Sequence, residues 1–306
     1  MSPGHLREER VALGIAGGGE HVATQGGEGL GGAPEAQQRE PVRPHRLVSA
    51  RQDPGLAMAW WGIALVNGPH INNPMVDEAR ARLAWLALAE ARARSNGASA
   101  VERALIEALG ARYAWPQPAD RHPLDEAYAK AMAAVFQRFP GDADVATLYA
   151  ESLMDVRPWD QWTRDGQPQP GTQEVLQALE TARRLDPDHP GALHLTIHAL
   201  EASPRPDQAR DAADRLRQLV PDAGHLVHMP SHIDVRLGRW SEAATANEKA
   251  MAADEHYRTR RLDPGFWAIY MAHNAHFLAY TAMMEGRREV ALALSLIHIS
   301  EPTRPY

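Results

Sequence analysis

Apolar residues recur at intervals of three and four along most of the chain between residues 50 and 294, and this spacing predicts helices. Ala-, Leu-, Glu- and Arg-rich stretches are separated by breakers such as Pro140-Gly141, where a helix is expected to end. No stretch alternates between apolar and polar residues in the manner of a strand. The predicted fold class is therefore all-α. The clearest helices are expected at 75–94, 98–113, 124–139 and 142–156.

A repeating unit closed by a proline divides the later part of this region. Pro187 and Pro221 lie 34 residues apart, each after an Arg-rich helical stretch, and Pro264 follows 43 residues later. The string LGRWSEA at 237–243 predicts a turn that leads into a second helix, and MEGR at 284–287 repeats that turn. Helix pairs of this length cannot bury their apolar faces alone, so successive units are predicted to stack on one another.

These units resemble tetratricopeptide repeats, and several longer strings resemble one family of bacterial tetratricopeptide-repeat (TPR) proteins. The strings are AMAWWGIALVNGPHINNP, LYAESLM, RPWDQW, DPDHPGALHLTIHALEAS, GHLVHMPSHI and MAHNAHFL. The resemblance implies a TPR-like superhelical array of antiparallel helix pairs, an α-solenoid, over residues 50–294. Because the family is described mainly by its repeats, the resemblance implies no particular activity.

The two ends of the chain depart from this pattern. Ten of the 23 glycines lie in the first 32 residues, so residues 1–49 are predicted to be a disordered leader or a misassigned, out-of-frame start. The string SLIHISEPTRPY at 295–306 resembles a translated sequencing-adapter tail of truncated metagenomic reading frames. The natural protein is expected to continue with other residues. Since the true N-terminus with any export signal is expected to be missing, localisation stays open, with a soluble cytoplasmic protein as the default.

Composition excludes several classes of function. The chain has no cysteine, which excludes disulfides, thiolate metal ligands and a cysteine nucleophile. The net charge is −7 and no dense basic stripe is present, which argues against nucleic acid as a partner. No stretch approaches the roughly 18 to 20 apolar residues of a membrane span. The partner is expected to be an unidentified protein or small-molecule ligand.

Histidines provide the clearest indication of chemistry, since nine of the 15 lie between residues 189 and 276. Three sets each share one face of a predicted helix, and Pro230 is expected to bend or restart the second of these helices. Each set follows a closing proline, so the stacked units are expected to bring the sets to one concave groove. The sets are His194 and His198 with Glu201; His225, His228 and His232; and His273 with His276.

Imidazole is a common ligand of Zn, Cu and Fe, and with no thiolate available a metal site here must use His and carboxylate ligands. Glu201 is expected to act either as a ligand or as a general base on metal-bound water. No HExxH or other known metal motif is present. The predicted ligands are His194, His198, His228, His232, His273 and His276. His70, His225 and Tyr270 are predicted to support these ligands or to contact substrate.

Three interpretations of the aligned histidines remain open: a metal or catalytic site, a groove for a polar ligand or peptide, and structural hydrogen bonding. The sequence therefore predicts a TPR-like helical protein whose His/Glu-lined groove binds a transition metal. Whether it is a metal-dependent oxidoreductase, a hydrolase or no enzyme stays open. The alternative is a non-enzymatic scaffold that binds a partner peptide in the groove. His189 and His256 are expected to be structural.

Overall fold

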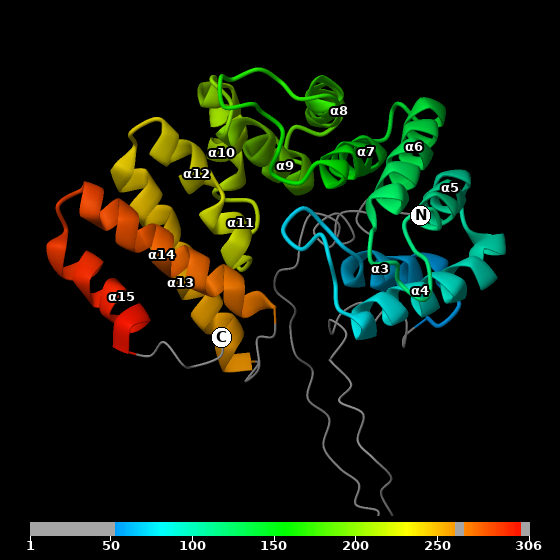
Figure 1. Cartoon of the computed structure of the whole chain (residues 1–306), viewed down its shortest axis with the longest axis horizontal. Helices are drawn as coiled ribbons and strands as arrows, with labels where there is room; N and C mark the ends of the chain where they lie inside the picture. Colours follow the sequence, from blue (N-terminus) through cyan, green and yellow to red (C-terminus); the bar gives the residue numbers. More distant parts are fainter. Residues whose placement is uncertain (1–52, 261–265, 301–306) are drawn as a thin grey trace, which may run out of the picture. The chain divides into compact units, whose positions relative to one another are not determined.

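The computed structural model describes residues 53–260 and 266–300, and this part of the chain is built from helices with no β-strand. The all-α prediction is therefore confirmed. The described residues fall into two units, 53–135 and 136–300, and Figure 1 colours them along the chain. The predicted leader lies outside the described residues. The prediction of one repeat domain over 50–294 stays a prediction.

The first unit consists of α3, α4 and α5, a short 3-10 helix and most of α6. Asp77 and Ser99 fix two of the helix starts, because each side chain accepts a hydrogen bond from a backbone N–H of the first turn. Tyr113 and Trp61 bind backbone carbonyls of α3 and α5 and so hold the helices together. The bounds are α3 Ala57–Asn67, α4 Glu78–Ala93, η1 Ser95–Gly97, α5 Ala100–Leu109 and α6 His122–Arg138.

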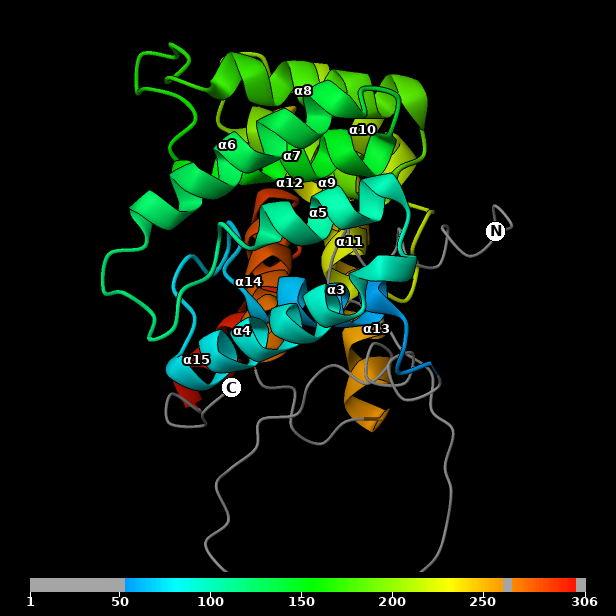
Figure 2. The same cartoon turned by 90° about the vertical axis from the view of Figure 1, so that its right-hand side faces the viewer.

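The second unit continues with helices that pack on their neighbours in sequence. α7 packs on α8, α8 on α9, α13 on both α12 and α14, and α14 on α15, as the two views in Figures 1 and 2 also show. The bounds are α7 Ala143–Val156, α8 Thr172–Leu185, α9 Pro190–Glu201, η2 Pro206–Ala209, α10 Arg210–Leu216, α11 Gly224–His228, α12 Pro230–Arg236, α13 Trp240–Arg260, α14 Trp267–Met284 and α15 Arg288–Ser300.

Four of the predicted helices correspond to α4–α7, with boundaries that moved by a few residues at most ends. N-caps account for three of the shifted starts, since Asp77, Ser99 and Asp142 each end the extended segment before a helix. Near the other end, α15 runs through the first part of the predicted tail as far as Ser300, and 301–306 lie outside the described residues.

The two turns that the sequence repeats have the same backbone geometry. Gly238 and Gly286 adopt positive φ angles of 71° and 74°, where a side chain is disfavoured. The next residue, Arg239 or Arg287, donates its N–H to the carbonyl five residues earlier at 2.8 Å in both turns. These turns join α12 to α13 and α14 to α15, so the two helices of each successive pair are connected by the same type of turn.

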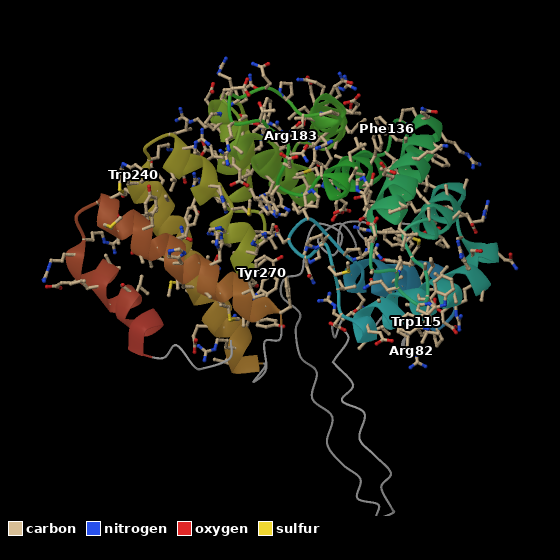
Figure 3. The ribbon with its side chains drawn as sticks, viewed as in Figure 1. Arg82, Trp115, Phe136, Arg183, Trp240 and Tyr270 are labelled. Atoms are coloured by element: carbon tan, nitrogen blue, oxygen red, sulfur yellow. The ribbon has the colours of Figure 1, made fainter. Side chains whose placement is uncertain are left out.

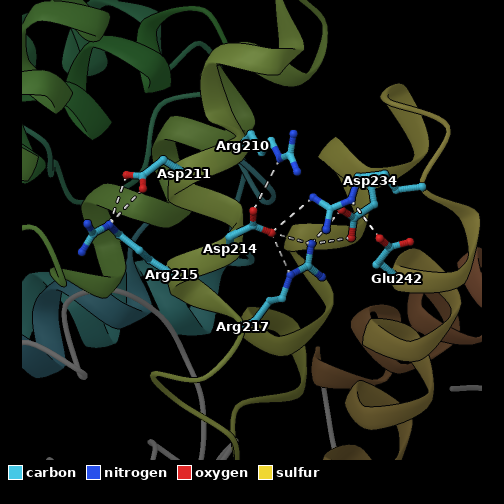
Figure 4. Close-up of polar contacts among 8 residues, drawn as sticks. Arg210, Asp211, Asp214, Arg215, Arg217, Asp234 and Glu242 are labelled. Carbon is cyan, nitrogen blue, oxygen red and sulfur yellow. Dashed lines mark hydrogen bonds and ion pairs between the residues drawn. The ribbon is translucent and has the colours of Figure 1, made fainter.

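A buried ion-pair network ties α10 to α12 and α13. Asp234 is fully buried, and both of its carboxylate oxygens accept a hydrogen bond from Arg217 Nη2 at 2.7 Å. Arg239 approaches the same carboxylate at 3.4 Å, and both arginines also bind Asp214 (Figure 4). Burial raises the pKa of Asp234, and the two arginines oppose this rise.

An apolar core lies between α9, α10, α11 and α12. Leu193 and Ile197 of α9 pack with Leu216 of α10, and Leu226 and Ile233 of the two following helices complete the cluster. These side chains are almost completely buried. The core fixes how α9 lies against α11 and α12, and these three helices carry most of the histidines predicted to form a site.

Candidate metal centre

Helix α9 presents His194, His198 and Glu201 on one face, as their spacing predicts. Its start is fixed by His189, whose Nδ1 accepts the N–H of Ala192 while Nε2 lies 2.8 Å from Asp144 Oδ1 on α7. His189 is therefore a structural cap, as predicted.

Helices α11 and α12 carry the next set of histidines. Helix α11 ends at His228 and α12 begins at Pro230, so the proline restarts the helix, which was one of the two predicted outcomes. The close approach of Gly224 to α13 sets the position of α11, because a Cβ at Gly224 would lie 2.1 Å from Asp254 Oδ1. His225 and His228 are thus held beside α14, which packs against α11.

Two groups of three histidines meet between α9, α11, α12 and α14. The first triad is His194, His198 and His225; the second triad is His228, His232 and His273. Within each triad, one ring nitrogen from every histidine lies within 4.8 Å of the other two. The rings of the two triads are also close, with centroids 5.9 Å apart for His198 and His232.

The cluster is largely removed from solvent. His194, His198, His225 and His228 are between 0% and 5% exposed, and His232 and His273 are partly buried. Histidines in an open ligand groove would be more exposed than this. The sequence predicted which side chains share a face, whereas their burial follows from the packing of α9 and α14 on the helices between them.

Glu201 connects the two triads. Its Oε1 accepts a hydrogen bond from His198 Nδ1 at 2.7 Å, and its Oε2 lies 2.5 Å from His232 Nδ1. Burial raises the pKa of the Glu201 carboxyl, but the interactions with His232 and His198 outweigh it and hold this pKa below its ordinary value. The carboxylate is therefore ionised at neutral pH and accepts one hydrogen bond from each triad.

Asn247 of α13 determines which nitrogen of His228 carries the proton. Asn247 Nδ2 donates to the carbonyl of Ala243 at 2.8 Å, so its Oδ1 faces His228 Nδ1 at 2.7 Å. An amide oxygen only accepts hydrogen bonds, so His228 Nδ1 must be the donor. The lone pair of neutral His228 then lies on Nε2, which is 2.8 Å from Nε2 of His232.

Most of the clustered histidines are neutral because of their surroundings. Burial, together with the neighbouring imidazoles, lowers the pKa of His225 and His228 well below the ordinary value. Burial also lowers the pKa of His198, with Glu201 opposing the change, and it lowers the pKa of His273 to about 4. Neutral imidazole is the form that binds metal ions.

Aromatic side chains enclose the cluster. Tyr270, labelled on α14 in Figure 3, packs on His225 with ring centroids 4.4 Å apart. Phe277 contacts the rings of the second triad, 5.0 Å from His228 and 4.8 Å from His232. Trp159, in the loop between α7 and α8, meets His198 edge-on at 4.7 Å and is itself 54% exposed.

Two of the predicted site residues, His225 and His276, differ in their relation to the triads. His276 is exposed and belongs to neither triad. Its predicted role as a ligand stays a prediction. His225, predicted to support the ligands, is instead a member of the first triad.

The other predicted residues lie as follows. Tyr270 contacts the triad histidine His225, and its predicted supporting role stays a prediction. Glu201 touches the Nδ1 atoms of two triad histidines, and its predicted role as a ligand or general base stays a prediction. His70 belongs to the first unit, where its Nδ1 accepts the N–H of Asn72 at 3.3 Å, and its predicted contact with the site stays a prediction.

Sequence reasoning missed Asn247 and Phe277 as site residues. Asn247 stands in the string NEKA, which resembles the second helix of a repeat, and Phe277 stands in MAHNAHFL. A useful signal was the four-residue spacing that places Phe277 on the same face as His273. Asn247 has no comparable signal, since it reaches the cluster from a different helix.

Comparisons with known proteins do not assign this chain to a group. No protein-family model matches it, and no curated protein matches it. Within the described residues, no helix is both long enough and apolar enough to cross a membrane. The proposals that follow therefore rest on the geometry of the histidine cluster.

Proposed function

We propose that this protein binds a first-row transition-metal ion, and that the second triad is its metal site. The observation that carries the proposal is the 2.8 Å contact between Nε2 of His228 and Nε2 of His232. His228 donates through Nδ1 to Asn247, and His232 directs Nδ1 at the Glu201 carboxylate. When both rings are neutral, each directs a lone pair at the other across this contact.

Two lone pairs at this distance repel each other unless a cation lies between them. A shared proton would place a positive charge on this pair, next to the Glu201 carboxylate that His232 contacts. A metal ion uses the same two lone pairs, and nitrogens about 2.0–2.1 Å from one tetrahedral ion lie roughly 3.3 Å apart. His273 adds a third nitrogen within 4.8 Å of the other two, which makes a three-imidazole site.

The surroundings of the triad match what metal-ligating histidines require. Such histidines usually donate their second N–H to a carboxylate or carbonyl oxygen, which fixes the tautomer and increases the basicity of the ligand nitrogen. Asn247 supplies an amide oxygen to His228, and Glu201 supplies a carboxylate to His232. The aromatic ring of Phe277 restricts solvent on one side.

The donor set favours metals that accept imidazole ligands. Three neutral nitrogens suit Zn, Cu, Fe and Ni better than Mg or Ca, which prefer oxygen. Because both oxygens of Glu201 already accept from histidines, Glu201 is poorly placed to take a proton from metal-bound water. If the protein is an enzyme, we therefore propose an oxidoreductase rather than a hydrolase.

The scaffold that we propose is a TPR-like array. The equivalent turns at Gly238 and Gly286 support this proposal, as do the two helix pairs that they close. Each triad takes ligands from more than one helix pair, so stacking of the pairs would assemble the site. The alternative function, a groove for a partner peptide, would require exposed histidines, and four of the six are buried.

Metal content of the purified full chain tests the proposal. The wild-type protein, a His228→Ala, His232→Ala double variant and a His256→Ala control would be loaded with Zn, Cu or Fe, gel-filtered and measured by mass spectrometry. His256 is exposed and lies outside both triads. We expect the wild type and the control to retain the same amount of metal and the double variant to retain less by about one equivalent. Absence of retained metal from the wild type with all three metals would overturn the proposal.

A further inference from the structure

We infer that the first triad is a second metal site and that the cluster is a dinuclear centre with three imidazoles for each ion. This inference rests on the proposed function, because it extends the metal site at the second triad to its neighbour. The first triad has the same composition as the second, and each of its histidines also offers one nitrogen within 4.8 Å of the others.

The ligand atoms of the first triad are directed at one another. Nε2 of His194 lies 3.2 Å from Nε2 of His225, close to the roughly 3.3 Å that separates two nitrogens on one tetrahedral ion. His198 uses Nδ1 for Glu201, so its remaining ring nitrogen is Nε2. This Nε2 is buried and has no hydrogen-bond partner among the described residues, while the whole residue is 5% exposed.

A buried imidazole nitrogen without a partner costs free energy that a metal ion would recover. Leaving a buried polar atom unsatisfied costs about 1–3 kcal/mol, and such atoms are rare in folded proteins. Two buried ring nitrogens of the first triad, Nε2 of His198 and Nδ1 of His225, have no hydrogen-bond partner within the described residues. An ion that binds Nε2 of His198 would satisfy the first of them.

The two triads are close enough to act as one centre. Their rings approach each other at two places, with centroids 5.9 Å apart for His198 and His232 and 6.2 Å apart for His225 and His228. Glu201 accepts a hydrogen bond from one histidine of each triad. A change in the charge at one ion would therefore reach the ligands of the other through a shared carboxylate.

The charge of the site favours copper in its monovalent form. Six neutral imidazoles and the single carboxylate of Glu201 bring one negative charge to a largely buried cluster. Two divalent ions would leave an excess of three positive charges, whereas two monovalent ions leave one. Copper binds imidazole strongly and is the first-row metal in this set with an accessible monovalent state.

The test is to count copper in the full-length protein and then to measure how the copper ions interact. Cuprous ion would be added without oxygen in the presence of a weak chelator, and retained copper would be counted after gel filtration. His194→Phe removes a ligand from the first triad and His273→Phe removes one from the second, both with an aromatic ring retained. His256→Ala is the matched control, and circular dichroism would show that each variant is folded.

We expect two equivalents of copper in the wild type and the control, and one in each triad variant. After oxidation to cupric ion, neighbouring spins couple, so the paramagnetic resonance signal per copper should be lower in the wild type than in either variant. One equivalent in the wild type would overturn the inference and leave the proposed function intact. Two equivalents with the same signal per copper in all proteins would also overturn it. No copper in the wild type, with no other metal retained, would overturn the proposed function itself.

Discussion

The carboxylate of Glu201 on α9 lies 2.5 Å from Nδ1 of His232 on α12, and its other oxygen accepts from His198 on its own helix. One acidic side chain thus orients a histidine in each triad. Because the carboxylate increases the basicity of both imidazoles, removing its charge should weaken metal binding without removing a ligand.

Glu201→Gln is expected to lower metal affinity by about 10- to 100-fold, because it removes the charge and leaves one acceptor oxygen for the two Nδ1 atoms that Glu201 contacts. Competition with a chelator of known affinity would measure the change. Glu255→Gln, at an exposed position, is the matched control and should leave the affinity unaltered. An unchanged affinity in Glu201→Gln would show that this carboxylate has no role in tuning the ligands.

Asn247→Leu should both destabilise the protein and weaken the second triad. The substitution keeps a similar volume but removes the oxygen that accepts from His228 Nδ1, which leaves a buried N–H unsatisfied at a cost of about 1–3 kcal/mol. Urea unfolding of the metal-free protein would measure this loss. Asn247→Asp retains an acceptor and should keep the metal affinity, so equal losses in the two variants would contradict the assigned proton position.

The metal-free protein should lose stability as the pH falls from about 6.5 to about 4. The pKa of His273 is lowered from 6.5 to about 4 by burial, and the pKa values of His225 and His228 are also well below the ordinary value. Between the unfolded and folded values, the unfolded chain binds protons that the folded chain does not, so protonation favours unfolding. The loss approaches about 1.4 kcal/mol per pH unit for each such group.

Urea midpoints measured across pH 4 to 8 would test this slope. His273→Phe removes one of the groups and should give a shallower dependence below pH 6.5. Equal slopes in the variant and the wild type would show that His273 titrates normally in the folded protein.

Trp159→Gly should stabilise the protein relative to Trp159→Ala. Trp159 has a φ of +61°, in the left-handed region where a residue with a Cβ is disfavoured by about 1–2 kcal/mol. Both variants lose the contact of the indole with His198, so the difference between them isolates the backbone conformation. Unfolding free energies from urea titration give that difference. Equal free energies for the Gly and Ala variants would show that the backbone at residue 159 is not strained.

Asp234→Ala is expected to cost about 3–5 kcal/mol, because it leaves Arg217 and Arg239 without their fully buried carboxylate. Asp207→Ala provides the comparison, since Asp207 pairs with Arg205 at the surface and exposed pairs of this kind contribute little to stability. Thermal unfolding of both variants would test the contrast. A loss at Asp234 as small as that at Asp207 would show that the network does not hold α10 to α12.

Periodicity alone predicted the helices and the faces that carry the histidines, because both depend on residues three or four apart. The interruption at Pro230 was predicted from the proline itself, since proline lacks the N–H that a helix interior requires. Which histidine points inward at the end of a set was harder to predict. His225 is buried and His276 is exposed, and this difference follows from how α11 and α14 pack.

Hydrogen-bond partners from other helices could not be predicted from spacing. Asn247 meets His228 through the packing of α13 on α11, and the 19 residues that separate them carry no local pattern. Glu201 was predicted as a site residue, yet its contact with His232 depends on how α9 lies against α12. The sequence thus indicates which residues face a neighbouring helix, while tertiary packing determines the atoms that meet.

The second triad draws His228 and His232 from α11 and α12 and His273 from α14, a separate helix 41 residues further along the chain. A nascent chain that ended before α14 would carry the whole first triad and two thirds of the second. An ion bound by His273 would link consecutive helix pairs, and its binding free energy would stabilise their packing. Metal loading of the second triad would therefore report that synthesis had passed α14 and that these helix pairs had docked.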